Sequence, residues 1–227
     1  MTNFNRVSVV ASILAALITA YGCASQKAIS REKQSAIHSV SVAQSVSIPD
    51  HPVVFGPSSN SKVMVFGPFA ALTARASDNP DSQALKNLFE KEKIDIGKIV
   101  RQEFIAGLKQ SGAFPEVDAP QGDARFELTI EEYGLAAAGM HPMSPIHPPL
   151  SPQLKVAGKL TGRNGALLWQ NSAFLTGLSH RMEGHLFKEI LADPRQTREM
   201  FTKAAQIVSA DLLKDFGPDR DRAVYVE

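Results

Sequence analysis

A turn dipeptide, Asn164-Gly165, carries the strongest fold signal in the sequence. It favours a β-hairpin with a type I′ turn, because both central residues of that turn need positive φ. The arm before it, residues 154–160, alternates apolar with polar side chains, and the arm after it, residues 166–175, contains Trp169 and Phe174. The sequence therefore predicts two antiparallel strands joined at residues 164–165.

A second alternating segment lies before the hairpin. Between residues 126 and 131, the side chains of Phe126, Leu128 and Ile130 alternate with polar ones, which is the period of a half-buried strand. Shorter apolar runs predict further strands at 38–48, 53–55, 62–66 and 114–117.

Two helices are predicted between these strands. Asn79-Pro80 begins the first, with the asparagine as cap, and this helix extends to about residue 92. The second covers residues 95–111 and ends at Gly112, where a C′ glycine belongs. Gly107 inside it indicates a close packing contact, because a helical glycine costs about 1 kcal/mol relative to alanine. Its apolar face comprises Ile96, Ile99, Val100, Phe104 and Leu108.

A third helix begins at Asp193-Pro194 and ends before Gly217-Pro218. Gln196 is placed to complete a capping box with Asp193. The buried stripe of this helix is predicted to contain Phe201, Ala204, Ala205, Val208, Leu212 and Phe216.

Together these elements predict an α+β fold. We expect a mostly antiparallel sheet with two or three amphipathic helices packed on one face, because each helix has a single apolar stripe. One domain is expected over residues 36–217, followed by a flexible charged tail at 218–227. Cys23 is the only cysteine, so no disulfide can form within the chain and the fold must rest on its core.

The first 22 residues have the pattern of a signal peptide. Arg6 is their only charged residue, and residues 7–18 form an uncharged run that is too short for the roughly 20 residues of a spanning helix. Cys23 follows directly. A lone thiol in an exported protein is open to oxidation, and acylation of the sulfur removes that exposure. The alternative is an ordinary cleaved signal peptide followed by an unmodified cysteine.

The string Ala20-Tyr21-Gly22-Cys23 resembles the lipobox of bacterial lipoproteins. This resemblance implies a diacylglyceryl group and an N-acyl chain on Cys23, and stable anchoring requires more than one chain. Lipoproteins kept at the inner membrane usually carry aspartate after the cysteine. Ala24 stands there instead, so the resemblance implies the periplasmic face of the outer membrane. Residues 23–35 are then a lipidated tether between membrane and domain.

The charge balance limits the expected partners. Removal of residues 1–22 leaves 205 residues with 23 basic and 23 acidic side chains. Without a basic surplus or stripe, nucleic acid is not an expected partner. The sequence has no phosphate loop, Gly-x-Ser-x-Gly elbow, His-Glu-x-x-His motif or cysteine pair. We therefore expect no enzymatic activity and no cofactor other than the covalent lipid on Cys23.

Two weaker patterns could carry chemistry. Glu131 and Glu132 are adjacent acids, but neighbouring residues of a regular strand point to opposite faces. Four histidines occupy two polar segments in which no regular element sets their spacing, so no metal site is predicted. They are His141, His147, His180 and His185.

Residues 140–152 form the best candidate for a partner-binding surface. The segment lacks periodicity and contains five prolines, and long irregular loops are usually functional or disordered. Its apolar residues have no periodic place in a core, which suggests contacts with a partner: Met140, Met143, Ile146 and Leu150. The alternative is a loop that folds back over the sheet.

Three segments resemble small bacterial outer-membrane lipoproteins: Ile99-Val100-Arg101-Gln102-Glu103-Phe104, Ser111-Gly112-Ala113-Phe114 and Asp123-Ala124-Arg125-Phe126-Glu127-Leu128. Such proteins include auxiliary lipoproteins of ABC-type lipid transporters and assembly lipoproteins of the curli-secretion and penicillin-binding-protein-activator kind. The resemblance implies a non-enzymatic binding or assembly component of a cell-envelope system, with envelope proteins as partners. The alternatives are a periplasmic carrier of a lipid or small apolar ligand, held between sheet and helices, and an unrecognised hydrolase.

Overall fold

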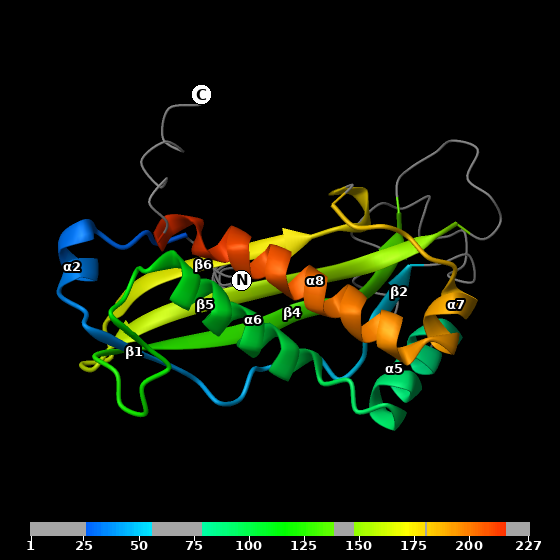
Figure 1. Ribbon diagram of the computed structural model, residues 1–227, viewed down its shortest axis with the longest axis horizontal. Coiled ribbons are helices and arrows are strands. Elements are labelled where there is room, and N and C mark those ends of the chain that lie inside the picture. Colours follow the sequence, from blue (N-terminus) through cyan, green and yellow to red (C-terminus); the bar gives the residue numbers. More distant parts are fainter. Residues whose placement is uncertain (1–25, 56–78, 139–147, 180, 217–227) are drawn as a thin grey trace, which may run out of the picture.

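One sheet crossed by helices forms the molecule (Figure 1), in a computed structural model that describes residues 26–55, 79–138, 148–179 and 181–216. Within these ranges the strands are β1 (Ser39–Val42), β2 (Val53–Phe55), β3 (Glu116–Val117), β4 (Ala124–Ala137), β5 (Leu150–Gly162) and β6 (Leu167–Leu175). The helices are α2 (Arg31–Ser35), α5 (Pro80–Lys91), α6 (Ile96–Ser111), α7 (Phe187–Ala192) and α8 (Pro194–Leu212), with 3-10 turns η3 (Gly177–Ser179) and η4 (Leu213–Phe216).

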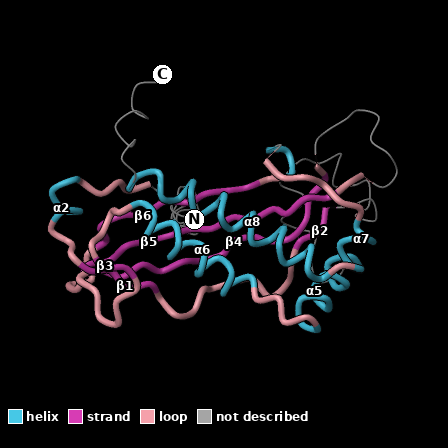
Figure 2. Tube along the Cα trace, in the orientation of Figure 1, coloured by secondary structure: helices cyan, strands magenta, loops and turns pink. Residues whose placement is uncertain are grey.

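The α+β class is confirmed, and the sheet is mostly antiparallel as predicted, with short parallel pairings that make it mixed. The strand order is β3-β1-β4-β5-β6, with β2 also paired to β4 (Figure 2). β4, β5 and β6 pair antiparallel as predicted, whereas β1 and β2 run parallel to β4. The physical reason is the connection: between β2 and β4 the chain passes through α5 and α6, and a crossover of this kind joins parallel strands.

The predicted hairpin joins β5 and β6, but its turn differs from type I′. Gly165 has φ +76°, while Lys93 and Asp118 are the only non-glycine residues with positive φ in the described part of the chain. Asn164 therefore lacks the positive φ that type I′ requires. Its side-chain Oδ1 instead accepts a hydrogen bond from the Ala166 N–H at 3.0 Å. The register shifts between residues 160 and 161, as in longer hairpin loops where one glycine closes a bulge.

The predicted helix boundaries are confirmed at their caps. Asn79 Oδ1 accepts from the Asp81 N–H at 3.0 Å and Asp95 Oδ1 accepts from the Lys98 N–H at 2.8 Å. Gly112 has φ +61° at the end of α6. At this position a left-handed residue ends the helix without the penalty that a Cβ would bring.

The capping box predicted at the start of α8 is half present. Asp193 Oδ1 accepts from the N–H groups of Arg195 and Gln196, both at 3.0 Å. The Gln196 side chain does not return to Asp193, because its Nε2 lies 3.1 Å from His185 Nδ1. The short helix α7, absent from the sequence prediction, lies just before and ends at the same aspartate.

Aromatic rings fill the space between the sheet and helices α6 and α8. The ring centroids of Phe104 and Phe126 are 5.2 Å apart, and those of Phe126 and Trp169 are 5.9 Å apart. Trp169 also lies 5.0 Å from Phe216 of η4. A Cβ added at Gly107 would lie 2.8 Å from Leu213 Cδ1, which confirms the close contact predicted for that glycine. Both predicted helical stripes therefore face this core.

The N-terminal segment differs from the predicted tether. Residues 23–35 were expected to be a free linker, yet Lys27 exchanges two backbone hydrogen bonds with Gln170 of β6, at 2.8 and 2.9 Å. Ile29 is buried and Ser30 caps α2. Residues 27–35 thus contact the domain that is predicted to begin at residue 36, because the apolar side chain of Ile29 is buried against it. In the described ranges, no helix is both long and apolar enough to cross a bilayer.

Candidate functional site

The sheet face opposite α6 and α8 carries a row of charged side chains. Lys159 Nζ lies 2.8 Å from Glu127 Oε2, and Lys155 Nζ lies 2.7 Å from Glu131 Oε2. Both pairs join β4 to β5 across directly facing or diagonal positions, where opposite charges stabilise a sheet. The hydrogen bond from Lys159 lowers the pKa of the Glu127 carboxyl. This face is polar and partly open to solvent, in contrast to the ring-filled face.

A β-bulge brings the acid pair onto this charged face. Ile130 pairs with Val156 but Glu132 pairs with Lys155, so Glu131 is an extra residue in β4. The prediction that Glu131 and Glu132 point to opposite faces is therefore wrong, because a bulge interrupts the alternation of a strand. Burial raises the pKa of Glu132, and the charge of Lys155 opposes that rise. The arrangement can accept hydrogen bonds or hold a cationic group.

Two buried polar side chains continue the same face of β5. Ser151 and Gln153 are 0% and 3% exposed, and Ser151 Oγ and Gln153 Nε2 have no hydrogen-bond partner among the described residues. They share the parity of Lys155, so all three project from one side of the strand. Nothing in the sequence marks them, because Ser151 lies in the proline-rich stretch that is predicted to be a loop and Gln153 directly follows it.

The edge strand β6 carries the most exposed aromatic side chain of the described residues. Phe174 is 48% exposed and pairs with Lys155 of β5. Asn171 Oδ1 accepts from the Ser172 N–H at 2.8 Å. Lys27 occupies the backbone groups of Gln170. These contacts satisfy some of the backbone hydrogen-bonding groups of the β6 edge, which could otherwise pair with another strand.

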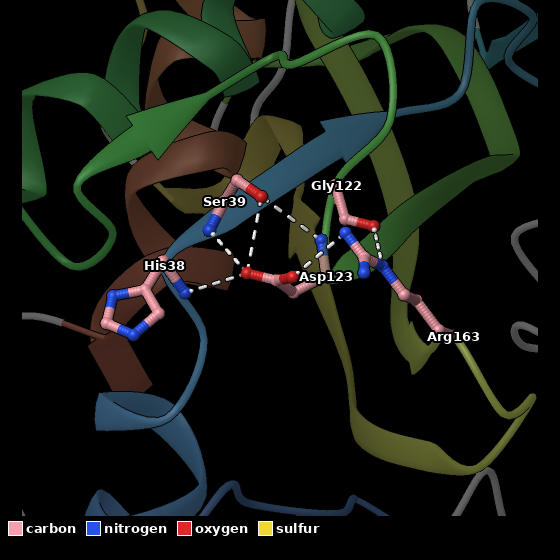
Figure 3. Close-up of polar contacts among 5 residues, drawn as sticks. All are labelled: His38, Ser39, Gly122, Asp123 and Arg163. Atoms are coloured by element: carbon pink, nitrogen blue, oxygen red, sulfur yellow. Dashed lines mark hydrogen bonds and ion pairs between the residues drawn. The ribbon is translucent and has the colours of Figure 1, made fainter.

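Asp123 ties the start of β1 to the β5–β6 turn (Figure 3). Its Oδ2 accepts from the backbone N–H groups of His38 and Ser39, at 3.1 and 3.0 Å, and Oδ1 lies 3.0 Å from Arg163 Nη2. Arg163 Nε donates to the Gly122 carbonyl at 3.2 Å. The Ser39 and His38 hydrogen bonds, followed by the Arg163 charge, lower the pKa of Asp123. The cluster joins segments and leaves the carboxylate fully engaged.

The predicted partner-binding residues divide into two groups. Met140, Met143 and Ile146 lie outside the described residues, and so does Cys23. The prediction that Leu150 is an exposed contact is wrong, because Leu150 begins β5, pairs with Ala137 and is 1% exposed.

A proline within β5, Pro152, accounts for the wrong prediction that Leu150 lies in a loop. The proline pairs with Leu135 of β4 inside β5. The backbone N–H of Leu150, two residues earlier, points away from β4 and donates to His185. Pro152 lies two residues after Leu150, so its backbone nitrogen points the same way, away from β4. Because β6 ends opposite Leu154, no β6 residue faces the missing N–H of Pro152. A proline is tolerated at such an edge position.

The four histidines do not form a described metal site. His141, His147 and His180 lie outside the described residues, and His185 binds Gln196. Within the ranges that the structure describes, no group of three or more His, Cys, Asp or Glu could hold a metal ion.

A cleft of about 530 Å³ lies at the N-terminus of α6, on the side of the sheet away from β6. Its lining includes Ile48, Lys98 and Arg101. Arg101 bonds Asp118 Oδ1 at 2.7 Å and the carbonyls of residues 42 and 43. The guanidinium is therefore used to hold the β1 segment against α6.

Comparisons with known proteins name no family for this chain. No family model matches it, and neither does any curated protein. A solved PelC dodecamer from Paraburkholderia phytofirmans is similar, with 14% identity over 85% of this chain and 93% of its own, at a TM-score of 0.40. A single-substitution variant of that dodecamer gives 15% identity over 79% and 87%, at 0.39. At these TM-scores, nothing about this chain's function follows from the likeness.

Proposed function

We propose that this chain is a lipid-anchored, non-enzymatic binding component of the bacterial cell envelope, held by Cys23 at the periplasmic face of the outer membrane. The observation that carries the proposal is the short length of chain between the domain and Cys23. Lys27 is bonded to β6, four residues after the lone cysteine that follows the signal-like segment. Cleavage before Cys23 would thus leave the domain joined to an acylated residue through residues 24–26.

The use of the carboxylates supports a binding role over catalysis. Asp123 holds β1, Asp95 and Asp193 cap helices, and Asp211 pairs with Arg181 and Lys214. Each of these acids has a structural partner that accounts for its position. A catalytic acid or base needs a proton that it can exchange with a substrate.

The packing between sheet and helices favours a binding component over a carrier of apolar ligands. Trp169, Phe104, Phe126 and Phe201 are all fully buried there and make ring contacts with one another or with Phe89. A ligand held between the layers would have to displace these rings. An apolar ligand site is normally a preformed concave pocket.

The anchor is tested by fractionating cells that produce Cys23→Ser. Acylation needs the thiol, so this variant should remain unprocessed or appear in the soluble periplasm, while the wild type floats with outer membranes. A Ser25→Ala variant, changed two residues later, serves as the matched control. A Cys23→Ser chain that still matures and fractionates with the outer membrane would contradict the proposal.

The binding role is tested at the predicted contact residues Met143 and Ile146. Changing both to Ser should leave the thermal melt unchanged and reduce crosslinked capture of envelope proteins, because the lost apolar contacts exist only in the complex. A lowered melting temperature would instead assign these residues to a cover over the sheet. An unchanged melt with undiminished capture would remove them as a docking surface.

A further inference from the structure

The exposed edge of β6 lies where the chain leaves the domain toward Cys23. β6 is the last strand of the sheet, and its outer side meets the chain at Lys27, which pairs antiparallel with Gln170. Because the pairing is antiparallel, the chain at Lys27 runs opposite to β6. Backbone hydrogen bonds of 2.8 and 2.9 Å hold Lys27 at this edge.

The remaining length of chain is short. Four residue steps separate Lys27 from Cys23, and four fully extended residues reach about 13–14 Å. Four residue steps of β6, from Gln170 to Phe174, span about 13 Å. The lipid on Cys23 thus has to enter the membrane within one short span of the β6 edge.

Phe174 is an exposed aromatic residue within this distance of Gln170. In the described part of the chain only Ile48 and Phe174 are large hydrophobic residues with exposed side chains, at 38% and 48%. Ile48 follows the bridge between Ser47 and Thr129 of β4, on the side of β4 that faces away from β5 and β6. An exposed ring on an edge strand is otherwise a liability for aggregation, and burial at a lipid surface removes it.

We propose that the β6 edge is the face that the domain presents to the membrane, and that Phe174 inserts into the headgroup region beside the acylated cysteine. This inference rests on the proposed lipid anchor. The occupant of the edge is a bilayer surface, because the short chain to Cys23 brings the membrane there whether or not a protein partner is bound. Aromatic side chains are enriched at the headgroup level of membrane proteins and on the buried faces of interfacial helices.

The test uses tryptophan as a depth probe in the full, acylated chain. Phe174→Trp and Ile48→Trp each add a second tryptophan to a protein whose native one, Trp169, is fully buried. Each protein is reconstituted into vesicles of phosphatidylethanolamine and phosphatidylglycerol, with or without bromine near the glycerol end of the acyl chains. We expect bromine to quench the added emission of Phe174→Trp and to leave Ile48→Trp equal to the wild type.

The outcomes separate this inference from the anchor itself. A protein that floats with the vesicles but is quenched equally at both positions, or at neither, overturns the membrane-facing edge and leaves the anchor intact. A protein that does not float overturns both. If tryptophan disturbs the fold, the same comparison is made with bimane on Phe174→Cys and Ile48→Cys, since an acylated Cys23 leaves only the new thiol to react.

Discussion

On one face of the sheet Phe104, Phe126 and Trp169 pack edge to face under α6 and α8, whereas on the other face Glu127 meets Lys159 and water. Both faces come from the same strands, and alternation along each strand separates them. The difference teaches where the stability of this chain resides. Without a disulfide, the ring-filled face must supply most of it, and the charged face is left available for contacts outside the domain.

The largest effects should follow truncation of rings on the helical face. Phe104→Ala and Phe201→Ala each remove a fully buried side chain and should lower the free energy of unfolding by about 3–5 kcal/mol. Phe174→Ala removes a ring that is 48% exposed on the other face and should cost far less. Urea melts of the three variants of the soluble 24–227 chain make the comparison. Equal losses at Phe104 and Phe174 would abolish the distinction between the faces.

Leu150 should behave as a core residue and not as a contact residue. It is 1% exposed at the start of β5, so Leu150→Ala should destabilise the domain by about 2–5 kcal/mol. Leu150→Met nearly conserves the volume and should cost under about 1.5 kcal/mol. Thermal melts of both variants are the measurement. A Leu150→Ala protein with the melting temperature of the wild type would return this residue to the candidate binding surface.

Asp123 should give the domain an acid-sensitive component. Hydrogen bonds from the Ser39 and His38 backbone, then the Arg163 charge, hold its pKa below the ordinary 3.8. A depressed carboxyl pKa stabilises the fold above the unfolded value, and this contribution disappears as pH falls through the folded pKa. Urea midpoints from pH 7 to pH 3 should therefore fall, and Asp123→Asn should lower the midpoint at pH 7 and flatten the decline. An unchanged profile in the variant would assign the decline to other acids, such as Asp211, whose pKa is lowered by Arg181 and Lys214 despite burial.

Much of the helical face could be predicted from the sequence because its signals are local. The caps at Asn79, Asp95 and Asp193 depend on contacts within three residues, and the stripe of α8 depends on a period of 3.6. These predictions required no knowledge of which strands pair. The same is true of the alternation in 126–130, which places Phe126 inside.

The candidate surfaces could not be predicted because they depend on pairing between distant segments. The bulge at Glu131 exists only relative to β5, and Pro152 is admissible only because β6 ends opposite Leu154. The backbone hydrogen bonds between Lys27 and Gln170 join residues 143 positions apart, and no local sequence pattern predicts them. A polar stretch after a signal-like segment therefore had the pattern of a linker although it contacts the domain.

The smallest effect is expected for the ion pairs of the charged face. Lys159 and Glu127 are 51% and 40% exposed in their side chains, and exposed pairs contribute about 0.2–1 kcal/mol. A double-mutant cycle with Lys159→Met and Glu127→Gln should give a coupling energy in this range that decreases with added salt, since ions screen exposed charges. The control cycle uses Arg101 and Asp118, whose side chains are 15% and 30% exposed and where the guanidinium also bonds two carbonyls. Its coupling should be larger and less sensitive to salt. If the Lys159 pair coupled as strongly as the Arg101 pair, the charged face would itself contribute to the stability of the fold. Its side chains would then not be free for contacts outside the domain.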